Sequence, residues 1–453
     1  MRYRLLFADA QGVVYDHPRL LAAVRSGDEV RAPRERAAPL PEGASLCLLP
    51  GRKPVGVDPV TGEAVALSEV TVGRRTFVPH AVGATLPPGW TRALLPAAVR
   101  PPLPTAGAPI LPQWAYTAAA LGEGGPVVFA LHTDRRRHWS PSSHSTPDLA
   151  SRVEARLAST ENPVWRQIAR CALEWRCFTA QNTFYGRDEG AIPSSAACNA
   201  ACVGCLSEQE AGMPPASHER IVRPPSAEDM AELASEHLAT ARGRVMVSFG
   251  QGCEGEPLLR WRELAKAIRL TRARTGRGSI HLNTYGSLTE ALGALLDAGL
   301  DACRISLNSA SHDLYAAYYR PTGYGLEDVI RSMELAVRRG AYLSLNLLTF
   351  PGVTDREEEA ERLWQLVGEV RPHQIQTRSL AIDPDLYLGL ARGKGGGGRA
   401  IGMRALLEGL RRARPGLAIG NFSRARSERA SAAPPRRAAS PGRSRLAQGE
   451  RTP

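Results

Sequence analysis

Strand-like and helix-like segments alternate along this chain from residue 191 onward, and no other feature of the sequence constrains the fold as strongly. Short apolar and β-branched runs predict strands at 191–195, 245–250, 279–283, 302–307, 342–348 and 374–379. Helical periodicity predicts helices between these strands, at 226–242, 261–275, 287–298, 325–339 and 355–370, with a last helix at 403–414. Such strand–helix repeats are typical of a parallel sheet with helical crossovers.

This α/β pattern predicts a partial (β/α)6 TIM-like barrel over residues 191–415. The strands are too few for the closed barrel of eight, so an open barrel fits, with its working face at the carboxyl ends of the strands. A flat, doubly wound sheet is the alternative, and periodicity does not separate the two folds.

The chain before residue 191 has a different pattern. Residues 1–165 contain short apolar runs between turns, for example at 46–49 and 127–131, and they carry no catalytic motif. We therefore predict a smaller β-rich N-terminal domain of unknown role. Helical periodicity then predicts a connecting helix and a linker over residues 166–190, which lead into the barrel.

The net charge of +12 is concentrated at the end of the chain. From Arg411 onward there are eleven arginines and two glutamates, a net charge of +9, so residues 1–410 carry only +3. Residues 423–453 are rich in Arg, Pro and Ser and poor in apolar side chains, which predicts a disordered tail. A solvated basic tail is the simple interpretation, and binding of RNA or an acidic partner by the tail is the alternative.

Nothing in the sequence predicts a membrane span or a secretory leader. No run of about 18 or more apolar residues occurs, and Asp9 interrupts the apolar stretch near the N-terminus. The reducing cytoplasm is therefore the expected compartment, without a membrane partner.

Three of the eight cysteines, Cys198, Cys202 and Cys205, lie in one short segment directly after the first predicted strand. Thiolates this close together repel one another unless a cation holds them, and thiolates are the preferred ligands of iron–sulfur clusters and of zinc. A structural zinc site takes four ligands, whereas three thiolates leave one iron of a cluster open. A zinc knuckle completed by Cys253 or by a histidine is the alternative.

The spacing C-x-x-x-C-x-x-C after a first strand resembles the signature of the radical SAM superfamily. The resemblance implies that Cys198, Cys202 and Cys205 ligate a 4Fe–4S cluster, whose open iron binds S-adenosylmethionine. Reduction of this cluster cleaves the cofactor to a 5′-deoxyadenosyl radical, which abstracts hydrogen from a substrate. In the family, the residue just before the third cysteine is usually aromatic and packs near the adenine. This chain has Gly204 there, so we expect the adenine contacts to come from elsewhere.

The segment Gly255-Glu256-Pro257 after the second strand resembles the family's Gly-Gly-Glu-Pro motif. The resemblance implies that Glu256 holds the ammonium of the methionine moiety, and Gly255 would allow the backbone to approach the ligand closely. Glu254 is the alternative carboxylate.

Polar side chains at the ends of the later strands extend this candidate site. Alternation places Arg304, Ser306 and Asn308 on one face of the fourth strand. Arg304 is predicted to pair either with the cofactor carboxylate or with Glu256. The predicted cofactor-binding residues are Gly255, Glu256, Asn283, Ser306, Asn308 and Asn346. The residues predicted to face the substrate are Arg304, Arg378 and Cys253.

These features predict a radical SAM enzyme of unknown reaction class, with its catalytic residues unassigned. The sequence does not select among a small molecule, a peptide and an RNA as substrate, and a flavodoxin or ferredoxin is the expected electron donor. One alternative is an activase that makes a glycyl radical on a partner protein. The other is an RNA-binding module stabilised by zinc or an iron–sulfur cluster, without catalysis.

Overall fold

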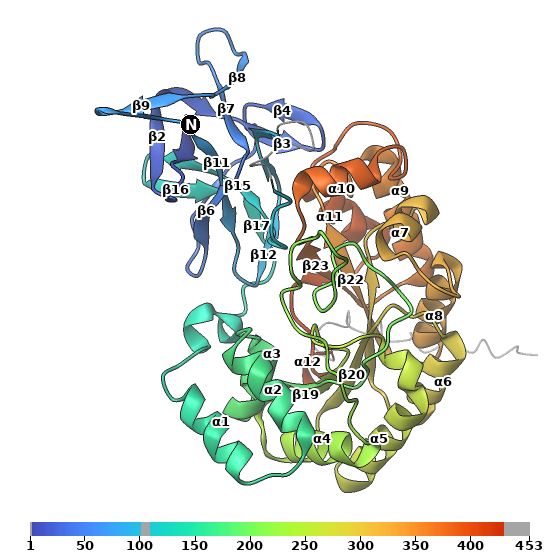
Figure 1. Cartoon of the computed structure of the whole chain (residues 1–453). Helices are drawn as coiled ribbons and strands as arrows, with labels where there is room; N and C mark the ends of the chain where they lie inside the picture. The colour runs from blue at the N-terminus through green and yellow to red at the C-terminus, as the bar shows by residue number, and fades with distance from the viewer. Residues whose placement is uncertain (1, 101–108, 430–453) are drawn as a thin grey trace, which may run out of the picture.

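The computed structural model of the chain describes residues 2–100 and 109–429. It contains a β-rich N-terminal domain, a group of three helices and an open barrel (Figure 1). None of the helices in these residues is long and apolar enough to cross a membrane.

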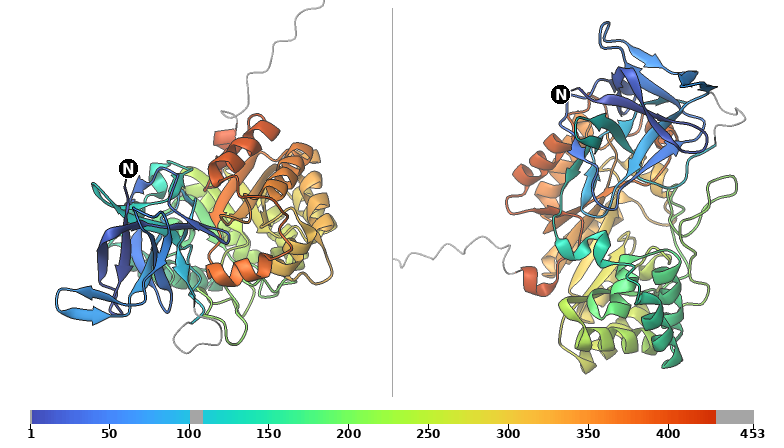
Figure 2. Two further views of the ribbon diagram at one scale, coloured as in Figure 1. Left: turned by 90° about the horizontal axis from the view of Figure 1, so that it is seen from above. Right: turned by 90° about the vertical axis from the view of Figure 1, so that its left-hand side faces the viewer.

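The barrel is one sheet of seven parallel strands that follow one another in sequence order. The sheet curls without closing, so β18 and β24 are its two edges (Figure 2). A doubly wound sheet needs a reversal of strand order, which this sheet lacks, so the predicted partial barrel is confirmed. The strands are β18 (Arg187–Ile192), β19 (Arg242–Phe249), β20 (Ser279–Thr284), β21 (Ala302–Leu307), β22 (Tyr342–Thr349), β23 (Gln374–Ser379) and β24 (Ala418–Gly420).

Two strands of the barrel differ from the prediction. The strand β24 was not predicted, because three residues are too short to show a period. The strand β18 begins before residue 191, at Arg187. The prediction missed this start because the first three residues, Arg187, Asp188 and Glu189, are charged and resemble a loop in sequence.

Helices follow the strands and lie on the outside of the curled sheet (Figure 1). Six of them match predicted segments. The first of these begins at a capping box in which Ser226 and Asp229 exchange hydrogen bonds. The matched helices are α4 (Ala227–Thr240), α5 (Trp261–Arg274), α6 (Thr289–Asp297), α8 (Leu326–Arg338), α9 (Glu357–Val370) and α11 (Met403–Ala413). The helices that were not predicted are α7 (His312–Tyr319) and α10 (Pro384–Ala391).

The N-terminal domain is built on a ten-stranded sheet whose pairings are antiparallel. This sheet contains β1 (Arg4–Ala8), β2 (Val14–Ala22), β5 (Ala38–Pro39), β6 (Ser45–Leu49), β7 (Lys53–Val57), β8 (Ala64–Ala66), β11 (His80–Thr85), β14 (Ala98–Val99), β15 (Thr117–Gly122) and β16 (Gly125–Val128). Smaller sheets contain β3 (Val24–Ser26), β4 (Glu29–Arg31), β9 (Val70–Val72), β10 (Arg75–Phe77), β12 (Trp90–Arg92), β13 (Leu95–Pro96) and β17 (Ala130–His132).

The predicted boundaries of 1–165 for this domain and 166–190 for a linker do not agree with the structure. The last strand of the domain ends at His132, and the helices α1 (Leu149–Ala158), α2 (Pro163–Leu173) and α3 (Phe178–Tyr185) occupy both predicted regions. The helices are packed units because their periodic apolar residues, such as Trp165 and Ile168, are buried.

The N-terminal domain is fixed to the barrel by buried arginines. Arg52 donates to the Asp383 carboxylate (2.5 Å), and both side chains are almost fully buried. Arg92 donates to the carbonyl of Leu380 (3.0 Å) and lies 4.8 Å from the centre of the Phe350 ring. Because these barrel residues lie in loops beyond the carboxyl ends of β22 and β23, the domain sits over the working face of the barrel.

The segment 421–429, which includes α12 (Arg426–Arg429), crosses the open seam between the edge strands β24 and β18. The Phe422 ring stacks on Trp139 with 4.9 Å between ring centres. Ser423 donates to the Glu189 carboxylate on β18 (3.1 Å), and Glu428 pairs with Arg244 on β19 (2.6 Å). The predicted tail from residue 423 therefore differs from the structure at its start, where the side chains of Ser423 and Glu428 have partners on the barrel. Residues 430–453 of the predicted tail lie outside the described residues.

We expect a chain that ends at Gly420 to be less stable than a chain that ends at Arg429 by roughly 3 kcal/mol. The shorter chain loses a buried phenylalanine and at least two hydrogen-bonded side chains of the seam. Urea unfolding of the two chains measures the difference. Equal midpoints and slopes would show that the seam contacts contribute nothing to stability.

Candidate active site

A cavity of about 480 Å³ opens at the carboxyl ends of the barrel strands. It brings together most of the predicted site residues, although they come from six different strands and loops. Those that line it are Cys202, Cys205, Gly255, Glu256, Asn283, Arg304, Ser306, Asn346 and Arg378. Three predicted residues, Cys198, Asn308 and Cys253, do not line this cavity.

The cysteine loop follows β18 and is held against the end of α7. Backbone N–H groups of Ala201 and Val203 donate to the carbonyls of Tyr319 (3.1 Å) and Tyr318 (3.0 Å). The side chain of Gln113, from the N-terminal domain, donates to the carbonyl of Cys205 (2.9 Å). Because both α7 and the N-terminal domain hold its backbone, the loop has a defined position at the mouth of the barrel.

The three thiols border a second cavity of about 440 Å³, and Cys202 and Cys205 face both cavities. Burial raises the pKa of Cys198 to about 11 and that of Cys202 to about 12, and neighbouring thiolates add to both shifts. Without a cation these thiols therefore stay protonated at neutral pH.

The donor set fits an iron–sulfur cluster in type and number. All eight cysteines are free thiols, and three of them share one cavity beside the barrel mouth. Among the described residues no three Cys, His, Asp or Glu side chains are close enough to hold a metal ion, so these thiols would have to converge when they bind one.

Glu256 lies at the carboxyl end of the second strand's loop and is almost fully buried. One carboxylate oxygen accepts from the Leu258 N–H (3.0 Å) and the Thr284 hydroxyl (2.5 Å). Among the described residues, the other accepts only from the Tyr285 N–H (2.9 Å). Burial raises the pKa of Glu256 to about 7. The second oxygen therefore retains a lone pair for a ligand in the cavity, as the predicted role requires.

Both carboxylate oxygens of Glu254, the alternative carboxylate, accept hydrogen bonds from other groups of the protein. One oxygen accepts from the backbone N–H groups of Ser194 (2.6 Å) and Ser195 (2.8 Å) and from the Ser194 hydroxyl (2.6 Å). The other oxygen accepts from the Gln251 N–H (2.6 Å). The three bonds from Ser194 and Ser195 tie the second loop to the cysteine loop, and the fourth stays within the second loop, so Glu254 has a structural role.

Gly255 is required for a different reason from the predicted one. Its N–H donates to the carbonyl of Ser195 (2.8 Å), and a Cβ at this position would lie 2.0 Å from the carbonyl oxygen of Ala197. The missing side chain therefore allows the two loops to approach each other, whereas we had predicted an approach to the ligand.

Two predicted residues are buried away from the main cavity. Asn308 donates to the carbonyl of Leu314 and to the Tyr387 hydroxyl (3.3 Å each). It lies beyond the end of β21, where the alternation that predicted its direction no longer holds. Cys253 lies against the Cys171 thiol, and this contact, together with burial, raises the pKa of Cys253 well above its usual value. Cys253 is therefore buried away from the main cavity, and its predicted position facing the substrate stays a prediction.

Tyr318 occupies the space beside Gly204. A Cβ on Gly204 would lie 2.7 Å from the Tyr318 hydroxyl, and Tyr318 and Tyr319 both line the main cavity. An aromatic ring is therefore supplied next to the third cysteine by α7, 114 residues along the chain from Gly204. Tyr285 adds another ring, with its hydroxyl 3.4 Å from the Cys202 sulfur.

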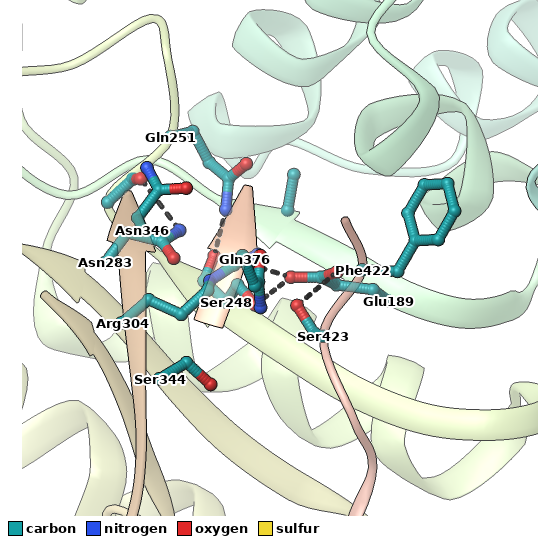
Figure 3. Close-up of polar contacts among 12 residues, drawn as sticks. Glu189, Ser248, Gln251, Asn283, Arg304, Ser344, Asn346, Gln376, Phe422 and Ser423 are labelled. Carbon is teal, nitrogen blue, oxygen red and sulfur yellow. Dashed lines mark hydrogen bonds and ion pairs between the residues drawn. The ribbon is translucent and has the colours of Figure 1, made fainter. Parts of the chain in front are cut away.

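Arg304 does not pair with Glu256, one of the two partners predicted for it, and its pairing with a cofactor carboxylate stays a prediction. It donates to the Glu189 carboxylate across the barrel interior (2.9 Å), and Glu189 also accepts from Ser248 and Ser423 (Figure 3). Sequence reasoning missed Glu189 because it was placed outside the first strand. The signal that was available is a carboxylate two residues before a buried apolar run, which alternation points into a barrel.

Residues 192–363 match the family model of the radical SAM superfamily. A search of curated protein sequences finds no match. Solved structures with a similar chain course include methylornithine synthase, at 14% identity, with 59% of this chain and 77% of that chain covered and a TM-score of 0.35. Streptococcus suis SuiB bound to S-adenosylmethionine is 14% identical, with 60% of each chain covered and a TM-score of 0.36. Coproporphyrinogen III oxidase from Escherichia coli, described as a radical SAM enzyme, is 12% identical, with 50% of this chain and 51% of that chain covered and a TM-score of 0.34. Likenesses this remote carry no information on a substrate.

Proposed function

Residues 192–363 of this chain belong to the radical SAM superfamily, and we propose that the protein is an enzyme that binds a 4Fe–4S cluster and S-adenosylmethionine. The observation that carries this proposal is the placement of the three cysteines. Cys198, Cys202 and Cys205 border one cavity, and two of them also face the larger cavity that Glu256 lines. A cluster held there would adjoin a cofactor-sized space.

In this proposal Cys198, Cys202 and Cys205 hold the cluster as thiolates. When bound, a 4Fe–4S cluster supplies the electron that cleaves S-adenosylmethionine to a 5′-deoxyadenosyl radical, which abstracts hydrogen from the substrate. Arg220 donates to the Cys205 sulfur (3.7 Å), which places a guanidinium beside the proposed cluster ligands.

The other cavity residues position the cofactor. The free lone pair of Glu256 accepts from the ammonium of the methionine moiety, which needs a partner once it leaves water. Asn283, Ser306 and Asn346 offer polar side chains along the same wall. Tyr318 supplies the aromatic surface that Gly204 lacks, and adenine packs against it.

The test is anaerobic reconstitution with iron and sulfide, followed by incubation with S-adenosylmethionine and dithionite. Dithionite stands in for the flavodoxin or ferredoxin that we propose as electron donor. A broad absorption band near ~400 nm and formation of 5′-deoxyadenosine are expected. A colourless protein that carries zinc and leaves the cofactor intact would instead support the binding-module alternative.

We expect Glu256→Ala to weaken binding of S-adenosylmethionine by roughly 2 kcal/mol or more, because the variant removes the charged acceptor of a buried ammonium. Iron content should stay unchanged, since no thiolate is altered. Calorimetric titration of the reconstituted variant measures the loss, and Glu263→Ala on the exposed side of α5 is the matched control. Wild-type affinity in Glu256→Ala would remove this loop from the cofactor site.

A further inference from the structure

A smaller chamber of about 290 Å³ adjoins the main cavity. Thr179, Arg304 and Arg378 line both spaces. The smaller chamber is bordered neither by Glu256 nor by any of the three cysteines proposed to hold the cluster. The aromatic side chains of Trp139, Phe178 and Phe422 line this chamber. A molecule in the chamber would therefore lie on the far side of the two arginines from the cysteine loop.

The charges around this chamber do not balance. Arg176, Arg304 and Arg378 line it against a single carboxylate, Glu189, and that carboxylate is already paired with Arg304 (2.9 Å). In the described part of the chain no carboxylate lies within ion-pair distance of Arg378. Its two hydrogen-bonded partners are the neutral amides of Asn346 and Gln376 (3.2 Å each).

Hydrogen-bond donors also exceed acceptors at this wall. The carbonyl oxygen of Gln376 accepts from Arg378 (3.2 Å) and from Arg304 (3.5 Å), so it brings the two guanidinium groups to one place. The Gln376 amide nitrogen and the Arg304 Nε are buried without a partner. The Nη1 group of Arg378 donates to no protein acceptor among the described residues. Both guanidinium groups have intermediate exposure, and a guanidinium that is partly removed from water is stabilised by a negatively charged partner, so this wall favours an anionic ligand.

We propose that Arg378 binds a carboxylate of the substrate, and that the apolar body of this substrate lies against Trp139, Phe178 and Phe422. The assignment as substrate rests on the proposed function. A carboxylate matches the planar fork of a guanidinium and offers two acceptor oxygens to the unpaired donors. The adjoining main cavity then places the rest of the molecule toward the cysteines. Burial and the neighbouring Arg304 lower the pKa of Arg378 to about 10, which leaves it charged at neutral pH.

The probe for this site is phenylacetate, an aromatic ring with one carboxylate, compared with its neutral amide phenylacetamide and with phenyl phosphate. Ligand-observed saturation-transfer NMR titrations use the reconstituted full chain, without dithionite and without S-adenosylmethionine. Phenylacetate should bind roughly tenfold or more tightly than phenylacetamide, as expected for a hydrogen bond to a charged group. Arg378→Met should remove that difference, and Arg378→Lys, which keeps the charge without the fork, should retain part of it.

The controls separate this site from the cofactor site and from loss of folding. Arg338→Met on the exposed face of α8 should bind phenylacetate as the wild type does. Arg378→Met should keep its iron and bind S-adenosylhomocysteine with unchanged affinity. If Arg378→Met does not fold, the comparison of Arg378→Lys with the wild type decides the question.

Three results would overturn the proposal. The first is equal affinity for the acid and its amide, and the second is a preference for phenyl phosphate over phenylacetate. The third is loss of S-adenosylhomocysteine binding in Arg378→Met, which would assign Arg378 to the cofactor carboxylate. Absence of cofactor cleavage by the wild type would contradict the proposed function alone, because the acid titration uses no turnover.

Discussion

Replacing Cys198, Cys202 or Cys205 with alanine should abolish loading of the iron–sulfur cluster. Reconstituted wild-type protein is expected to hold about four irons and four sulfides, and each single variant should hold close to none. The physical reason is that two thiolates are one ligand short of what the proposed cluster needs. Among the described residues, no three Cys, His, Asp or Glu side chains form a ready metal site, the three cysteines included. Iron and sulfide analysis, together with the absorption band, measures the effect.

The matched control is Cys47→Ala, because Cys47 lies in the N-terminal domain on β6 and borders neither cavity of the site. This variant should load like the wild type. Full iron in the triple variant of Cys198, Cys202 and Cys205 would refute the cluster assignment, whatever the activity of the protein.

Replacing Glu189 with alanine should destabilise the protein by about 3–5 kcal/mol, the cost of leaving a buried charge without its partner. Arg304 and Glu189 are both buried, with side-chain exposures of 11% and 4%. Glu189 also accepts from Ser248 on β19 and from Ser423 of the seam, so its loss frees donors on three elements. Urea unfolding of the wild type and the variant measures the change.

Two controls separate burial from charge pairing. Asp297→Ala removes an ion pair of similar length with Arg339 (2.7 Å) that lies on the surface, and it should cost no more than about 1 kcal/mol. The double variant Glu189→Gln with Arg304→Met removes both charges and should recover much of the stability lost in Glu189→Ala. If Glu189→Ala and Asp297→Ala lower the free energy of unfolding by the same amount, the ion pair in the barrel interior contributes no more to stability than the surface pair.

The parts of the fold that the sequence predicted correctly are those whose pattern is local. Strand–helix alternation from residue 191 predicted the barrel, since each buried strand carries its own apolar run and each helix its own period. The cysteine segment was found for the same reason, because its three thiols lie within eight residues of one another. Glu256, Asn283 and Ser306 follow from the strand ends, which meet at one edge of any parallel barrel.

Other features of the site depend on contacts between residues that are far apart in the chain. Arg304 and Glu189 are 115 positions apart, and Ser423 reaches the same carboxylate from 234 positions away. No local pattern selects these partners. Only the curling of the sheet decides that β18 and β24 face each other across a seam, and only then does residue 423 become part of the barrel.

The sequence by itself therefore determined the type of barrel, the three thiols and the row of polar side chains at the strand ends. The tertiary structure alone decided where each of those side chains points. Asn308 turns away because its strand has ended, and Gly255 is needed because Ala197 approaches it. Likewise Arg378 faces a chamber without a carboxylate partner among the described residues, because Glu189 is taken by Arg304. Local sequence fixes the period of an element, whereas the partner of a buried charge depends on packing between elements distant in the chain.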